Sequence, residues 1–193
     1  MNPAIDKSTS VAQVIADRKL YCHTPRFEPG GGGINVSRAI RKLGGVSTAL
    51  FPCGGPTGEY LLDLLQQESL VGQPIPVKGW TRESLVVLEE TSGRQFRFGM
   101  PGSSLSEKEW RNCLDALTGA NRTPDYIVAS GSLPPGVPDD FYAQVARIGK
   151  GLGARVIIDT SGNSLRLALL EGVYLIKPNI RELGELVGKD LVD

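Results

Sequence analysis

Four consecutive glycines stand directly before an apolar helix pattern, in the run Pro29-Gly30-Gly31-Gly32-Gly33-Ile34-Asn35. Each glycine loses more backbone entropy on folding than another residue would, so packing alone does not favour a run of four. Without Cβ atoms, the backbone N–H groups at a helix N-terminus can lie against an anion or an electron-rich oxygen. Asn35, in the first turn, could hydrogen-bond a hydroxyl group. The run therefore indicates either a ligand-binding helix start or a flexible turn before a helix.

The spacing of this run differs from two well-known glycine loops. It does not fit G-x-x-x-x-G-K-[ST], so it is not a Walker P-loop. No buried strand precedes it, as a dinucleotide-binding fingerprint requires, because the residues before it are Thr24-Pro25-Arg26-Phe27-Glu28-Pro29. A nucleotide-binding α/β protein of another class, such as a dehydrogenase, is therefore the least favoured of three hypotheses about function.

Alternating helices and strands must position this loop. Apolar residues recur at helical spacing in segments that begin near Val36, Leu61, Trp110, Phe141, Leu165 and Leu183. The short, largely apolar runs 47–51, 126–129, 156–158 and 173–176 contain many β-branched residues and predict buried strands. Such alternation is typical of an α/β fold, with a mostly parallel sheet and helices on both faces.

One region does not follow the alternation. Residues 84–89 and 95–99 predict two strands, joined across the turn signal Thr91-Ser92-Gly93. Residues 20–27 form another extended, partly polar stretch. We interpret segments of about 19–28 and 75–100 as a small β-flap, or lid, inserted into one α/β domain that spans residues 1–193.

Composition excludes several classes of function. The 21 basic and 21 acidic residues balance, so neither nucleic acid nor an anionic membrane is expected as a partner. Cys22, Cys53 and Cys113 are far apart in sequence and form no zinc motif. An odd number of cysteines, with no apolar segment at the start, predicts a reducing cytoplasm. His23 is the lone histidine, and no nucleophile signature accompanies it, which argues against Ser-His-Asp hydrolysis.

Four sequence blocks together resemble the PfkB branch of the ribokinase-like carbohydrate kinases. They are Asn2-Pro3-Ala4-Ile5-Asp6, the run from Phe27 to Ala39, Gly131-Ser132-Leu133-Pro134-Pro135-Gly136, and Lys177-Pro178-Asn179 with Glu182. Within this family the chain looks like the ATP-dependent 6-phosphofructokinases, because related kinases usually carry lysine where this chain has Gly32. The resemblance implies a ribokinase-like fold and ATP-dependent conversion of fructose 6-phosphate to fructose 1,6-bisphosphate.

The resemblance also implies roles for individual residues. The implied sugar-phosphate-binding residues are Asp6, Lys19, Gly31, Gly32, Asn35, Arg82, Arg97, Ser132 and Asp159. Two arginines suit a phosphate because each guanidinium can donate two hydrogen bonds to it. Lys177 and Asn179 would lie near the nucleotide, and Asn179 and Glu182 would hold Mg²⁺ through water. Taken alone, each of these residues is also explained by a turn, a helix cap or a solvated charge.

The segment that supplies the catalytic aspartate in this family does not occur in these residues. Family members carry it in a Gly-Ala-Gly-Asp sequence, and no Gly-x-Gly-Asp is present here. We assign no catalytic residue, and we expect a chain truncated at both ends and inactive by itself. The apolar strand that usually leads into the Asn-Pro block is also missing, which predicts a gap in the sheet.

Two hypotheses remain favoured. The first is a sugar-phosphate kinase of which the chain is a fragment or to which a missing piece is supplied in trans. The second is a non-catalytic sugar-phosphate-binding module, a relic of such a kinase. An in-frame continuation that encodes Gly-Ala-Gly-Asp would favour the first. In either case the resemblance implies a homodimer that pairs through the β-flap.

Overall fold

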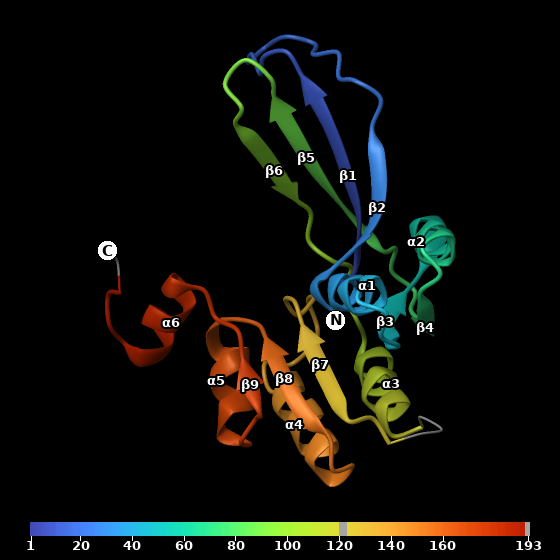
Figure 1. The fold of residues 1–193 in the computed structure, drawn as a ribbon, viewed down its shortest axis with the longest axis vertical. Coiled ribbons are helices and arrows are strands. Elements are labelled where there is room, and N and C mark those ends of the chain that lie inside the picture. Colours follow the sequence, from blue (N-terminus) through green and yellow to red (C-terminus); the bar gives the residue numbers. More distant parts are fainter. Residues whose placement is uncertain (120–122, 192–193) are drawn as a thin grey trace.

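The computed structural model of the chain describes residues 1–119 and 123–191. Figure 1 shows an elongated molecule in which a four-stranded lid extends from an α/β body. The elements follow one another as β1 (Ala4–Val11), β2 (Arg26–Gly30), α1 (Gly32–Lys42), β3 (Thr48–Cys53), α2 (Gly55–Gln67), β4 (Val71–Pro76), β5 (Arg82–Glu89), β6 (Gln95–Gly99), α3 (Glu107–Thr118), β7 (Tyr126–Ser130), α4 (Phe141–Gly151), β8 (Arg155–Asp159), α5 (Gly162–Leu170), β9 (Leu175–Ile176) and α6 (Ile180–Val187).

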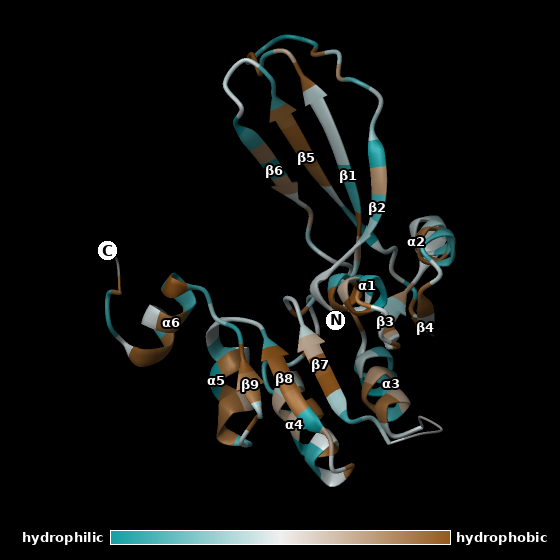
Figure 2. Ribbon diagram, viewed as in Figure 1, coloured by the Kyte–Doolittle hydropathy of each residue, from teal (hydrophilic) through white to brown (hydrophobic). Residues whose placement is uncertain are grey.

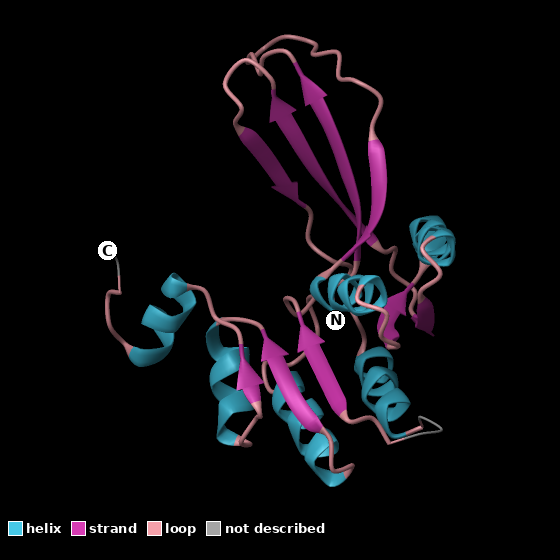
Figure 3. Ribbon diagram, viewed as in Figure 1, coloured by secondary structure: helices cyan, strands magenta, loops and turns pink. Residues whose placement is uncertain are grey.

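The body has the predicted parallel strands and intervening helices (Figure 3). The strands β7, β8 and β9 pair in parallel, and β3 pairs in parallel with β4. These two groups are not hydrogen-bonded to each other among the described residues. Helix α1 contacts both β3 and β7 and so bridges them, while α4 and α5 pack against β8. The α/β class is therefore confirmed, although its parallel strands form two sheets.

Two hydrophobic clusters stabilise the body. The larger one packs α3, α4 and α5 against β7 and β8 around Tyr142, Ile158 and Leu165, which are at most 1% exposed. The smaller one packs α1 and α2 against β3 and reaches Ile5 at the base of the lid. Figure 2 shows that β7 and β8 are mostly hydrophobic, as expected for strands covered by helices. No helix among the described residues has the length and apolar character that crossing a bilayer would require.

The lid is a sheet of order β2-β1-β5-β6. The hairpin β5–β6 agrees with the sequence prediction, and Gly93 adopts a φ of 68° in its turn. Strand β1 was not anticipated, because Asp6, Lys7, Ser8 and Ser10 give it little apolar signal. Strand β2 begins at Arg26, near the end of the extended stretch 20–27 expected from the sequence. The last residues of β4 fall in the predicted flap segment 75–100, but β4 pairs with β3 of the body and not with the lid.

The register of the lid brings its polar residues to one face. Asp6 lies opposite Glu28 of β2 and Ser84 of β5. Residues opposite one another across a ladder project to the same face of a sheet, as do residues two apart along a strand. By this rule Arg82, two residues before Ser84, and Arg97, opposite Val86, share the face of Asp6. The lid therefore gathers three of the predicted substrate-binding residues on one side.

Helix α3 shows how closely a local signal can specify an element. The sequence places Ser106 three residues before Glu109, the pattern of a capping box. In the structure the Ser106 backbone N–H and hydroxyl both donate to Glu109 Oε2, at 2.8 and 2.7 Å. Glu109 Oε1 also accepts from the Lys78 backbone N–H at 2.7 Å. The cap thus fixes the start of α3 and ties it to the segment between β4 and β5.

Candidate functional site

The glycine run is the junction between the lid and the body. Gly31 has a φ of 107°, a value that side-chain-bearing residues rarely adopt, and α1 begins at the next residue. A Cβ on Gly30 would lie 2.2 Å from Asp6 Oδ2, and one on Gly32 would lie 2.0 Å from Ser130 Oγ. By contrast, nothing lies within 4 Å of a Cβ on Gly33. The glycines therefore let Asp6 and the end of β7 approach the backbone at the start of α1.

Polar groups from three parallel strands meet at the same edge. Ser130 ends β7, Asp159 ends β8, and Lys177 follows β9. The Ser130 hydroxyl donates to Asp159 Oδ2 at 3.0 Å, and Asp159 Oδ1 lies 3.2 Å from Lys177 Nζ. Open α/β sheets bind ligands at the carboxyl ends of their strands. The structure therefore places Asp159 and Lys177 together where the fold favours a ligand.

Sequence reasoning selected Ser132 at this edge and missed Ser130. Ser132 is exposed, and its Oγ accepts from Asn2 Nδ2 at 3.1 Å. Ser130 is only 5% exposed and touches both Asp159 and the glycine run. A signal for it was available: the apolar run 126–129 ends one residue before it, so Ser130 is the first polar residue at the end of the strand.

A buried tyrosine holds the loop that follows β7. Tyr142 of α4 donates from its hydroxyl to the Gly131 carbonyl oxygen at 2.8 Å, and the Thr160 hydroxyl donates to the same oxygen at 3.1 Å. Burial raises the pKa of Tyr142, and the nearby Asp159 carboxylate adds to this rise. Tyr142 therefore stays protonated and able to donate. Tyr142 is the second residue of a helix, and no sequence pattern around it indicates this hydrogen bond.

Asp6 sits in the most charged part of the junction. Burial raises the pKa of Asp6, while the Arg82 and Arg38 cations oppose this rise and the Glu28 carboxylate adds to it. Arg82 donates to the Asn2 carbonyl oxygen at 3.3 Å, to Ser84 Oγ at 3.0 Å and to the Met100 carbonyl oxygen at 3.2 Å. These contacts fix the Arg82 guanidinium at the base of the lid, near Asp6.

Other predicted phosphate-binding residues lie farther out on the lid. Arg97 is exposed on β6 and donates to Gln95 Oε1 at 3.2 Å. Lys19 belongs to the loop between β1 and β2, beyond the outer end of β1, and its Nζ lies 5.2 Å from the centroid of the Tyr21 ring. The structure therefore does not bring Lys19 to the glycine run within a single chain. Asn35 is exposed at the first turn of α1.

Asn179 and Glu182 form the N-terminal cap of α6. The Glu182 N–H donates to Asn179 Oδ1 at 2.9 Å, and the Asn179 N–H donates to Glu182 Oε2 at 2.8 Å. The described residues contain no group of three His, Cys, Asp or Glu side chains that could hold a metal ion directly. The capped carboxylate keeps lone pairs for water, so the pair fits Mg²⁺ held through its water shell but not a protein cage. A cavity of about 320 Å³ between α5 and α6 borders Glu182 and Arg166.

Comparison with known proteins identifies the family of the chain. The family model described as pfkB family carbohydrate kinase matches residues 1–193. The ATP-dependent 6-phosphofructokinase isozyme 2 of Mycobacterium tuberculosis is 48% identical over 192 residues, and that of Escherichia coli is 45% identical over 194 residues. These alignments cover 100% and 98% of this chain but 56% and 61% of the relatives. The chain thus spans less than two thirds of the length of either.

Solved structures give the same result. The crystal structure of phosphofructokinase-2 from Escherichia coli in complex with fructose-6-phosphate superposes with a TM-score of 0.94 at 44% identity. The superposition includes 100% of the chain described here and 64% of the Escherichia coli chain. The ribokinase of Arabidopsis thaliana superposes with a TM-score of 0.68 at 18% identity, which shows a shared ribokinase-like fold. The chain belongs to the pfkB family of carbohydrate kinases.

Proposed function

We propose that the chain forms the sugar-phosphate-binding part of an ATP-dependent 6-phosphofructokinase and that its substrate is fructose 6-phosphate. One observation carries the proposal: Asp6, the glycine run and the ends of β7 and β8 converge where the lid joins the body. The comparisons support it, because the relatives at 45–48% identity are named as 6-phosphofructokinases.

In this proposal the sugar lies against the N-terminus of α1. Asp6 accepts hydrogen bonds from sugar hydroxyls, while Gly31, Gly32 and Asn35 hold the sugar at the helix start, where backbone N–H groups are free to donate. Ser132 and Asp159 face the same ligand from the edge of the parallel sheet.

The substrate phosphate and the nucleotide lie on two sides of the sugar. Arg82 and Arg97, on one face of the lid, contact the phosphate, and Lys19 supplies a further cation from the lid loop. Lys177 and Asn179 lie toward ATP, and Asn179 and Glu182 hold its Mg²⁺ through water. The pairing of Lys177 with Asp159 keeps this cation at the strand ends.

We further propose that residues 1–193 alone bind the sugar phosphate without phosphorylating it. In this proposal Asp6 and Asp159 bind the substrate, and Asp159 also bonds Ser130 and Lys177, so neither carboxylate is assigned as the proton acceptor. Phosphoryl transfer also needs an acceptor for the hydroxyl proton. Calorimetry should detect binding of fructose 6-phosphate, and a coupled assay with ATP should detect no turnover. Turnover would refute the inactivity, and absent binding would refute the proposed site.

Arg82 offers a direct test of the phosphate position. Arg82→Ala should weaken binding of fructose 6-phosphate more than binding of fructose, because only the former carries the phosphate. Arg94→Ala, in the β5–β6 turn, serves as a control that should change neither affinity. Equal losses for both sugars in Arg82→Ala would mean that Arg82 only supports the fold through Asn2 and Met100.

We also propose that two copies of the chain pair through the lid. We propose in addition that the protein is cytoplasmic. The lid exposes large apolar side chains: Tyr21 is 79% exposed, Phe98 46% and Leu88 37%. A solved relative is described as the tetrameric inhibited form of phosphofructokinase-2 from Escherichia coli. The free cysteines suit a reducing compartment. Sedimentation of the chain and of Phe98→Glu should show a dimer and a monomer, respectively; a wild-type monomer would contradict the proposal.

A further inference from the structure

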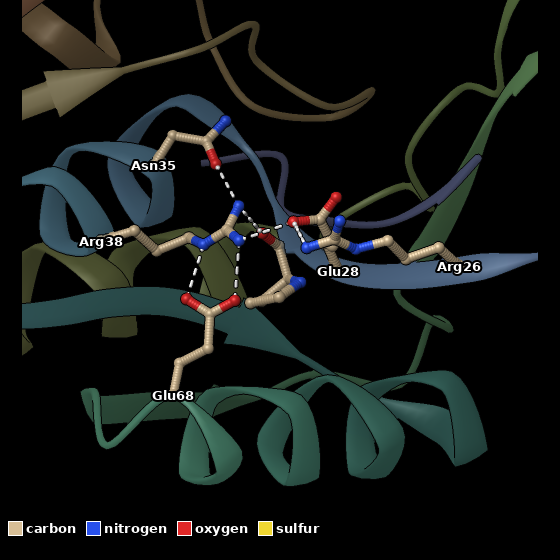
Figure 4. Close-up of polar contacts among 6 residues, drawn as sticks. Arg26, Glu28, Asn35, Arg38 and Glu68 are labelled. Carbon is tan, nitrogen blue, oxygen red and sulfur yellow. Dashed lines mark hydrogen bonds and ion pairs between the residues drawn. The ribbon is translucent and has the colours of Figure 1, made fainter. Parts of the chain in front are cut away.

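Arg38 stands on α1, one turn after Asn35, with its side chain only 18% exposed. Its Nε and Nη2 groups each donate to Glu68 at 2.7 Å, and Nη2 also donates to Glu28 at 2.9 Å. Nη1 makes two longer contacts of 3.5 Å, with the Pro29 carbonyl oxygen and Asn35 Oδ1. A guanidinium carries five N–H donors, and these five contacts engage all of them. Figure 4 shows Arg38 at the centre of this network.

The partners of Arg38 lie on both sides of the glycine run. Glu28 and Pro29 belong to β2, the lid strand that leads into the run, whereas Arg38 itself belongs to the helix that leaves it. Glu68 is the C-terminal cap residue of α2 in the body. Gly30 ends β2 and Gly32 begins α1, so Gly31 alone lies between the strand and the helix. Because a glycine backbone is conformationally permissive, this joint does not fix the angle between strand and helix by itself. The Arg38 contacts span this joint and connect the lid to α1 and α2.

The same side chain adjusts the charge around Asp6. Asp6 and Glu28 are direct cross-strand partners, and like charges in that position repel. The charged groups that face Asp6 are Arg82 from β5, Glu28 from β2 and Arg38 from α1. Burial raises the pKa of Asp6, and the two cations oppose this rise. The hydrogen bond from Arg38 is also the largest cause of the lowered pKa of Glu28. Arg38 therefore neutralises Glu28 beside the predicted sugar-binding carboxylate.

The Asn35 side chain is oriented by the same group. Its Oδ1 faces Arg38, and its amide nitrogen points away from the network (Figure 4). This leaves an N–H donor directed outward from the helix start, where the proposed function places sugar hydroxyls. A lysine at position 38 could restore the charge but not the forked contacts, because an ammonium group is a single point of charge.

We propose that Arg38 is a positioning residue that braces the lid across the glycine run. Through its contacts with Glu28 and Asn35, it holds Asp6 and Asn35 in position for hydrogen bonds to the sugar. The proposal rests on the proposed function for its ligand, but the brace itself exists without ligand. Arg38 contacts no reacting group in this assignment. It acts through Glu28, Asp6 and Asn35.

The first experiment uses the full chain without ligand. In Arg38→Gln, amide hydrogen exchange of residues 27–34 should accelerate at least about tenfold, because strong charge-assisted contacts across the joint are lost. Carbon-13 NMR titration should show a higher pKa for Asp6 in this variant. Arg41→Gln, on the exposed side of the same helix, should change neither quantity. Arg38→Lys should keep the Asp6 pKa near the wild-type value, but amide exchange of residues 27–34 should be as fast as in Arg38→Gln.

Glu28→Gln gives a second, milder variant that keeps the Arg38–Glu68 pair. It should also accelerate exchange in residues 27–34, but it should lower the Asp6 pKa, since it removes the like charge. These opposite shifts cannot come from a general loss of stability. The proposed brace is refuted if neither the amide exchange of residues 27–34 nor the Asp6 pKa changes in Arg38→Gln. If Arg38→Gln does not fold, the same two measurements on Glu28→Gln decide.

The second experiment measures affinity for fructose 6-phosphate by calorimetry. Arg38→Gln should weaken binding at least about tenfold, and Arg41→Gln should not weaken it. If the wild-type chain does not bind while the ligand-free readouts change as expected, the proposed function fails and the brace stands. If binding is intact in Arg38→Gln despite a loosened joint, the inferred link between the brace and the sugar site is wrong.

Discussion

Replacing Gly32 with alanine tests whether the glycine run is shaped by the end of β7. The new Cβ would lie 2.0 Å from Ser130 Oγ, 3.0 Å from Ser130 Cβ and 3.4 Å from the Gly131 nitrogen. Ser130 is 5% exposed, and its hydroxyl donates to Asp159 at 3.0 Å. The smallest accommodation is rotation of the Ser130 hydroxyl to another rotamer, which breaks that hydrogen bond.

The magnitude follows from the bond that is lost. A hydrogen bond to a charged group contributes about 1.5–3 kcal/mol. Exchanging glycine for alanine at a helical position recovers about 0.4–1 kcal/mol through the unfolded state. We therefore expect Gly32→Ala to lower the free energy of unfolding by about 1–2 kcal/mol, measured by urea denaturation. Fructose 6-phosphate binding should weaken as well, because the rotated Ser130 hydroxyl no longer holds Asp159, a proposed substrate-binding residue.

Two further variants separate this cause from a general intolerance of side chains. Gly33→Ala places its Cβ in open space, so it should be neutral or stabilise by up to about 1 kcal/mol. In a Ser130→Ala background the clashing oxygen is absent, so Gly32→Ala should cost at least about 1 kcal/mol less than in the wild type. The reasoning would be refuted if the two substitutions were additive or if Gly33→Ala cost as much as Gly32→Ala.

Two more predictions concern ionisation. The Ser106 hydrogen bonds are the leading cause that lowers the pKa of Glu109 below 4.5, so the stabilisation they give is present above that pH and lost as the pH falls. Glu109→Gln should therefore be less stable than wild type at pH 7 in urea titrations, and the difference in unfolding free energy should narrow as the pH falls below 4.5. A difference that stays constant as the pH falls would contradict this. Burial raises the pKa of the Cys113 thiol to about 11 and that of the Cys53 thiol above 9.0, whereas Cys22 is exposed. The thiol reagent DTNB should therefore react rapidly with one thiol in the native chain and with three after unfolding. Rapid reaction of more than one thiol in the native chain would show that the body opens.

Most local elements could be predicted from the sequence because their signals are local. The β5–β6 hairpin follows from its turn residues and the apolar residues on either side, and the start of α3 follows from Ser106 and Glu109. Strand β1 could not be predicted, because its polar residues become a central strand only when β2 and β5 pair with both of its edges. Strand β4, with two prolines and a glycine, is likewise stabilised by pairing with β3.

The candidate site divides in the same way. The glycine run, Asp6 and the arginines were identified from the sequence, and the register of the lid brings Asp6, Arg82 and Arg97 to one face. Ser130, Tyr142 and Arg38 were missed, because each acts through a partner distant in sequence or on another element. Lys19, by contrast, was selected from the sequence through its match to the family, but the structure places it at the outer end of the lid, which the match does not indicate.

The sequence by itself determined the α/β class, the family and the glycine run at the start of a helix. The class and the helix start depend on periodicity and local turn chemistry, and the family depends on the order of four motifs along the chain; all of these can be found without knowing the fold. Only the tertiary structure decided what the glycines accommodate: the Asp6 carboxylate at Gly30 and the Ser130 hydroxyl at Gly32. The physical reason is that the space beside a backbone atom is set by segments as many as 98 residues away, between Gly32 and Ser130, and no local pattern records which side chain will arrive there.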